Sequence, residues 1–257
     1  MNKTEAVDQL VRKYLEKKEL TLAINALELD PSNDSLNELL MQKCIDHGIP
    51  DHAVKLSRIR KCELTIEEKD RILNQCILLK KIGDAMYLAN LGISKKSLNK
   101  LANTLINKNE IENALKISEL GISTSMLNKL TLKCLSEGYL DYAMHLAEKG
   151  VDSKILDKLL FKYAKNGLVD YTLHISKLQE KGLPIYEKEV LIQSYLKNND
   201  LEHIAGDIRP GSHKKLVEKI IQFYLKKSML SKAIMMAKLN NRTLSVCEIN
   251  TLANRLK

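Results

Sequence analysis

The chain carries one pattern of hydrophobic and polar positions that repeats about every 29 residues. The pattern is clearest between Glu112 and Gly167, where residues 112–138 align with residues 141–167 at an offset of 29. Within each repeat, aliphatic residues recur at the spacing of one helical face and polar residues occupy the other face. A fixed period of this length is typical of stacked helical repeats, in which each unit packs only against its neighbours.

Each repeat is predicted to hold a longer first helix, helix A, and a shorter second helix, helix B. Most helix B segments contain one small anchor residue, and the anchors follow at intervals of 29 to 32 residues: Ala23, Ala53, Ala85, Ala114, Ala143, Thr172, Ile204 and Ala233. The inward face of helix A includes Cys44, Cys76, Cys134 and Tyr163, which we expect to be core residues. The pattern predicts an all-α fold, a right-handed α-solenoid of about eight helix-turn-helix repeats.

Glycines and polar residues indicate where the helices end and begin. Gly48, Gly83 and Gly138 are expected to close helix A in the left-handed conformation that favours glycine. Thr65 and Glu68 have the spacing of a capping box at the start of a helix A.

One position of helix A, fifteen residues before each anchor, is always polar, and we call it the polar column. Its members are Asp8, Glu38, Asp70, Asn99, Asn128, Asp157, Glu189 and Glu218, with Asn250 fitting a ninth repeat. The residue four positions later lies on the same helical face. These side chains either bind a ligand along stacked helices or are surface residues that favour the helix dipole. As ligand-binding candidates we select Asp70, Asn74, Asn99, Asn103, Asn128, Asp157, Glu189 and Gln193.

The positive charge of the chain is concentrated near its C-terminal end. The formal net charge is +9, and residues 205–257 hold 11 Lys and Arg against 3 Asp and Glu. We therefore divide the chain into a helical repeat array, residues 1–204, and a basic C-terminal continuation of the same solenoid, residues 205–257. The basic patch comprises Arg209, Lys214, Lys215, Lys219, Lys226 and Lys227. It is either a binding surface for an acidic partner such as RNA or the solvated end of the array.

Little in the sequence indicates catalysis, a cofactor or a membrane anchor. The five cysteines include no CxxC pair, which favours a reducing compartment. A glycine-rich phosphate loop, a nucleophile elbow and a metal-ligand motif are not recognisable, so we expect neither an enzyme nor a cofactor. The N-terminal residues do not resemble a signal or transit peptide, and no apolar run is long enough to span a membrane, so the expected location is the cytoplasm.

The repeat resembles those of the tetratricopeptide and pentatricopeptide superfamily. Residues 156–184 are similar to a pentatricopeptide motif, with Asp157, Tyr163 and Gly167 at its polar, core and turn positions, and residues 23–31 are similar to a tetratricopeptide helix B. The repeats here are shorter than the roughly 34 residues of that superfamily. The resemblance implies that helix A lines a concave face and that the polar column and the position four residues later face the ligand.

Two functions follow as hypotheses. The first is a non-enzymatic scaffold that recognises a protein or peptide segment on its concave face. The positions one and five residues after the polar column are rich in Lys and Arg, with Lys100, Lys129 and Lys133 among them. The alternative function is a pentatricopeptide-like RNA-binding protein that uses these Lys and Arg columns and the basic C-terminal region. Six of the nine polar-column residues are acidic, which disfavours reading of RNA bases one repeat at a time because carboxylates repel phosphates.

Overall fold

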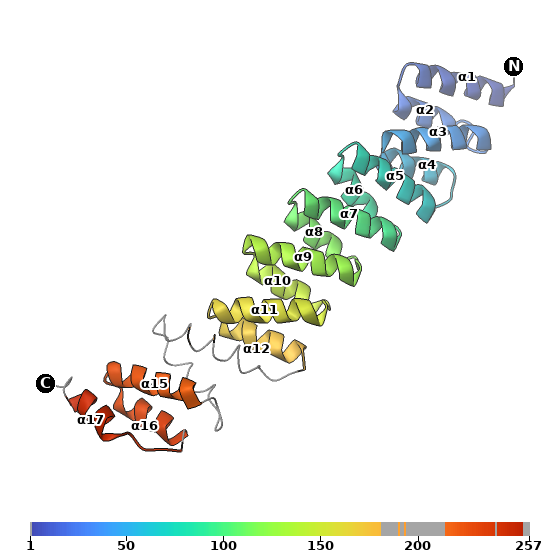
Figure 1. Ribbon diagram of the computed structural model, residues 1–257. Coiled ribbons are helices and arrows are strands. Elements are labelled where there is room, and N and C mark those ends of the chain that lie inside the picture. Colours follow the sequence, from blue (N-terminus) through green and yellow to red (C-terminus); the bar gives the residue numbers. More distant parts are fainter. Residues whose placement is uncertain (1, 181–189, 191–192, 194–213, 240, 254–257) are drawn as a thin grey trace. The chain divides into compact units, whose positions relative to one another are not determined.

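The computed structural model describes residues 2–180, 190, 193, 214–239 and 241–253, and the regular structure within those ranges is helical throughout (Figure 1). The chain divides into two compact units, Met1–Gly138 and Tyr139–Lys257. The boundary that we predicted between residues 204 and 205 lies outside the described residues.

The first unit consists of alternating longer and shorter helices. Its A helices are α1 (Lys3–Glu16), α3 (Asp34–His47), α5 (Ile66–Leu78), α7 (Lys95–Asn107) and α9 (Thr124–Glu137). Its B helices are α2 (Leu20–Leu27), α4 (Pro50–Ile59), α6 (Ile82–Asn90) and α8 (Ile111–Ser118). From α3 onward each A helix packs on the next A helix, and each B helix packs on the next B helix. This two-layer stacking, visible in Figure 1, confirms the all-α solenoid class.

The second unit continues the helix-turn-helix plan. Helices α10 (Leu140–Glu148), α11 (Ser153–Lys165) and α12 (Val169–Leu178) pack on one another. Near the C-terminal end, α15 (Lys214–Lys226) packs against both α16 (Leu230–Leu239) and α17 (Val246–Ala253). The buried contacts of α15 and α16 are supplied by Ile220, Ile221, Tyr224, Ala233 and Met236.

The predicted core positions are buried. The anchor residues of the described helices, Ala23, Ala53, Ala85, Ala114, Ala143, Thr172 and Ala233, are fully buried, whereas Ile204 lies outside the described residues. Cys44, Cys76 and Cys134 are also fully buried, and burial raises the pKa of the Cys44 thiol to about 12. These cysteines therefore serve as small apolar side chains of helix A.

The helix ends follow the sequence signals at most positions. Gly48 and Gly138 are the left-handed C-caps of α3 and α9, and Thr65 forms the capping box with Glu68 at the start of α5. The prediction for Gly83 was wrong, because this glycine lies inside α6 and Lys80, with φ 60°, takes the left-handed position. Within the described residues, no helix is both long enough and apolar enough to cross a bilayer.

Candidate functional site

The polar column of the first unit forms bonds between successive A helices. The Asp70 side chain on α5 accepts a hydrogen bond of 3.0 Å from the backbone N–H of Ser94, the N-cap residue of α7. Asn99 on α7 accepts the equivalent bond of 2.8 Å from Ser123, the N-cap of α9. Each of these two acceptor oxygens is therefore already engaged within the fold.

These bonds occur where the repeat is 29 residues long. Asp70, Asn99 and Asn128 follow one another at intervals of 29, whereas Asp8, Glu38 and Asp70 are separated by 30 and 32 residues. Asp8 instead pairs with Arg12 on its own helix at 2.8 Å. Glu38 is exposed and makes no recorded polar contact with any described residue. The inter-helix bond and the 29-residue period thus occur together in this unit.

A second set of contacts, which we call the amide–cation ladder, crosses the exposed side of the same A helices. Arg71 on α5 donates to the Gln42 oxygen on α3 at 2.7 Å, and Lys100 on α7 donates to the Asn74 oxygen on α5 at 2.7 Å. Lys129 on α9 donates to Asn103 on α7, and also to Asn107 at 3.0 Å. An amide oxygen is a neutral acceptor, so each cation keeps its net charge.

The ladder makes α7 and α9 a cationic surface. These two helices carry Lys95, Lys96, Lys100, Lys129 and Lys133 against a single carboxylate, Glu137. Glu137 forms an ion pair of 2.6 Å with Lys133. Asn74, Asn99, Asn103 and Asn128 are half-buried here. The structure therefore places the candidates on α5, α7 and α9 in one layer of helices.

The candidates of the second unit are more dispersed. Asp157 on α11 is exposed and accepts a hydrogen bond of 2.8 Å from Gln179. Glu189 lies outside the described residues, and Gln193 is an exposed helical residue.

The basic patch is described only in part. Lys219, Lys226 and Lys227 on α15 are exposed, and the Lys227 ammonium lies 5.9 Å from the centre of the Phe223 ring. Lys214 and Lys215 form the first turn of α15, and Arg209 lies outside the described residues.

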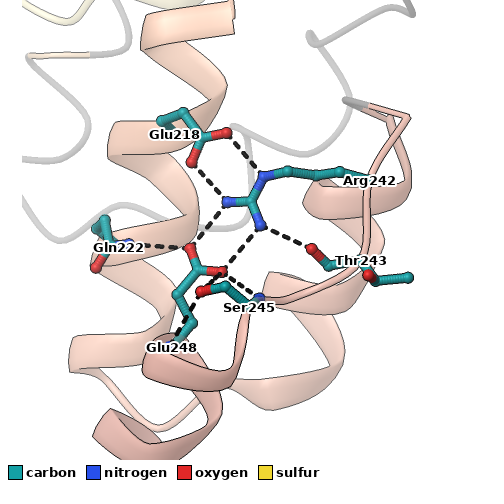
Figure 2. A network of polar contacts seen from close by, with 6 residues as sticks. All are labelled: Glu218, Gln222, Arg242, Thr243, Ser245 and Glu248. Carbon is teal, nitrogen blue, oxygen red and sulfur yellow. Dashed lines mark hydrogen bonds and ion pairs between the residues drawn. The ribbon is translucent and has the colours of Figure 1, made fainter.

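A partly buried polar cluster joins α15 to α17 at the polar-column residue Glu218 (Figure 2). Arg242 Nε donates to one Glu218 oxygen at 2.8 Å, while Nη2 donates to Glu248 at 2.8 Å. The hydrogen bond from Arg242 lowers the pKa of Glu248 to about 2 against the opposing effect of burial, with further help from Ser245. Gln222 also donates to Glu248, at 3.0 Å. The cluster therefore holds α15 and α17 together through Arg242, which bridges the two glutamates.

A pocket that the sequence patterns did not predict lies between α3 and α5. Its volume is about 740 Å³, and it is lined by Pro31, Ser32, Asp34, Asn37, Glu38, Met41, Gln42, Ile45, Arg60, Cys62, Glu68 and Arg71. The sequence signal for this pocket was the interval of 32 residues between Ala53 and Ala85, against 29 in each of the next three intervals. Part of the additional length falls in the turn between α4 and α5. Among the described residues, no group of three or more His, Cys, Asp or Glu side chains is arranged to hold a metal ion.

Comparisons with known proteins leave the family open. No family model matches the chain, and no curated protein matches it. A solved structure similar to it is a "circular tandem repeat protein with novel repeat topology and enhanced subunit contact surfaces", with 14% identity, a TM-score of 0.13 and coverage of 98% of this chain. The chain spans about half, 52%, of the length of that protein. Membership of the tetratricopeptide and pentatricopeptide superfamily stays a prediction, and the helical-repeat fold is established by the helices and their packing.

Proposed function

We propose that this chain is a non-enzymatic helical-repeat scaffold that binds a protein segment along the exposed side of α5, α7 and α9. The observation that carries this proposal is the amide–cation ladder, which presents equivalent side chains once per repeat. A surface with the same donors at regular intervals suits an extended or helical segment, because such a segment also offers its groups at regular intervals.

The charges on the ladder favour a segment with acidic side chains. One carboxylate and one amide of the polar column, those of Asp70 and Asn99, each accept a hydrogen bond from a backbone N–H group through one oxygen. Arg71, Lys100 and Lys129 are exposed and have neutral amide partners. Carboxylates of a partner can therefore form charge-assisted hydrogen bonds with these cations without first breaking an ion pair.

A selection from a random peptide library, followed by fluorescence anisotropy, tests this function. The triple variant Arg71→Gln, Lys100→Gln and Lys129→Gln should lose at least about tenfold in affinity for the acidic peptides selected, since each charge-assisted contact contributes about 1 kcal/mol or more. The matched control is Lys18→Gln, Lys80→Gln and Lys116→Gln, which removes the same charge at exposed positions outside the ladder. Equal loss in both variants would show that only net charge matters and would contradict the proposed site.

Binding of single-stranded RNA is the second candidate, and it is favoured by aromatic residues in the second unit. Phe161 on α11 is exposed between Lys158 and Lys162, and Phe223 on α15 lies beside Lys227. Aromatic rings flanked by cations can stack on bases while the cations contact phosphates. Phe161→Ala should then weaken RNA binding, and affinity should fall steeply with salt concentration. RNA binding that is insensitive to this substitution but lost in the ladder variant would move the RNA site to the first unit and replace the peptide proposal.

A further inference from the structure

Two residues that line the pocket between α3 and α5 each carry a buried polar atom without a hydrogen-bond partner. They are the Asn37 side-chain oxygen and the Arg60 Nε nitrogen, an acceptor and a donor. Asn37 is only 5% exposed, and its amide nitrogen donates to the carbonyl oxygens of Pro31 and Asn33, which fixes the orientation of the amide. Buried polar groups are normally satisfied, so two such atoms beside one pocket mark it as a place to look for a bound group.

Arg60 has similar surroundings to Arg242, except that its Nε has no carboxylate acceptor. Both arginines precede a helix that begins with a capping box, and each contacts the glutamate of that box: Arg60 contacts Glu68 at 3.1 Å and Arg242 contacts Glu248 at 2.8 Å. Arg242 Nε has a second carboxylate, Glu218, as its acceptor (Figure 2). Glu38 is the polar-column residue of α3, as Glu218 is of α15, but it does not accept a hydrogen bond from Arg60. Arg60 Nε therefore has no acceptor.

The walls of the pocket carry opposite charge. The α3 wall contributes two carboxylates, Asp34 and Glu38, together with the unpaired oxygen of Asn37. The facing wall contributes two guanidinium groups, Arg60 and Arg71, of which only Arg60 has a carboxylate partner, Glu68. Pro31, Met41 and Ile45 add apolar surface.

We propose that this pocket binds a small zwitterion of the α-amino-acid class. The ligand carboxylate accepts from Arg60 Nε, as the Glu218 carboxylate does from Arg242, and it also faces Arg71. The ligand ammonium donates to Glu38, Asp34 and the Asn37 oxygen. The side chain of the ligand contacts Met41, Ile45 and Pro31. A volume of about 740 Å³ is within the range of small-molecule sites.

The experiment uses the full chain and follows the Arg60 Nε–Hε resonance by NMR, assigned through its loss in Arg60→Lys. The twenty amino acids are added singly at about 10 mM, an excess over a millimolar dissociation constant. At least one should shift the Arg60 resonance in a saturable manner. Its N-acetyl derivative, without the ammonium, and its amide, without the carboxylate, should each bind at least about tenfold more weakly.

Glu38→Gln tests the α3 wall without altering the core, because Glu38 is exposed. This variant should weaken binding of the amino acid by about tenfold, whereas the control Glu112→Gln, an exposed position on α8 outside the pocket lining, should leave it unchanged. The proposal is overturned if no amino acid shifts the Arg60 resonance, the result expected when Glu38 or water satisfies Arg60 in solution. It is also overturned if both derivatives bind as well as the parent amino acid.

Discussion

The backbone N–H of Ser123 donates a hydrogen bond of 2.8 Å to the side-chain oxygen of Asn99, and this contact joins α9 to α7. Asn99→Ala leaves the N–H of an N-cap residue without its partner. We expect the free energy of unfolding to fall by about 1–2 kcal/mol, as for other lost hydrogen bonds of partly buried groups. Urea unfolding followed by circular dichroism measures the change.

Two further variants test whether the loss of stability in Asn99→Ala comes from the lost hydrogen bond. Asn99→Asp keeps an acceptor oxygen and should retain most of the stability, as Asp70 does at the preceding junction. Asn103→Ala, which removes only a ladder contact, should change the free energy of unfolding by less than about 0.5 kcal/mol. A larger loss for Asn103→Ala than for Asn99→Ala would show that the ladder, and not the polar column, holds the A helices together.

Gly48 and Gly83 should respond in opposite ways to alanine. Gly48 has a φ of 55°, and an added Cβ would lie 3.1 Å from the backbone nitrogen of Cys76. Gly83 lies inside α6 and an added Cβ would meet nothing within 4 Å. We expect Gly48→Ala to destabilise the protein by about 1–2 kcal/mol and Gly83→Ala to stabilise it by about 0.5–1 kcal/mol. Thermal or urea unfolding of the two variants checks the signs, and a destabilising Gly83→Ala would contradict the packing around α6.

Glu248 should make the α15–α17 region sensitive to acid. Its pKa is about 2 in the folded protein against an ordinary value of 4.5, so the unfolded state binds the proton more tightly and acid favours unfolding. The contribution, about 3 kcal/mol, is present in full above the ordinary pKa and is lost as the pH falls toward 2. Hydrogen exchange of the α15–α17 amides, corrected for the intrinsic rate at each pH, should show this loss of protection. In the Glu248→Gln variant the α15–α17 amides should be less protected at neutral pH, and their protection should not fall further as the pH drops toward 2. If the variant loses protection with acid as the parent protein does, Glu248 is not the origin of the acid sensitivity.

Thiol labelling should divide the cysteines into two classes. Burial raises the pKa of Cys76 and of Cys134 to about 11, so almost no thiolate is present near neutral pH. Cys62 and Cys247 are exposed. Iodoacetamide should modify these two in the folded protein, and Cys44, Cys76 and Cys134 only when the protein is unfolded. Mass spectrometry locates the label, and modification of Cys134 in the folded protein would show that α9 opens under native conditions.

The repeat plan was predictable because it depends on local patterns. Anchors such as Ala85 and core residues such as Cys134 follow helical periodicity, which the sequence displays directly. The polar column was recognised as a pattern, but its contacts were not, because a bond from Asn99 to Ser123 depends on how two helices pack. The constant spacing of 24 residues between each acceptor and the next N-cap serine was the available signal. The pocket at Arg60 was harder to predict. It arises from the longer turn between α4 and α5, and Glu38 does not accept a hydrogen bond from Arg60 Nε.

The bond between Asp70 and Ser94 also limits how the length of this chain can change. Deleting the 29 residues 94–122 would place Ser123 at 24 positions after Asp70, so the same type of bond could form again between α5 and the former α9. A deletion of one or two residues between Asn99 and Ser123 would instead shorten the spacing of this pair and displace the Asn99 oxygen from its N–H donor. Length variation between relatives of this chain should therefore occur as whole repeats, or within junctions such as the α4–α5 turn, where no such bond is made.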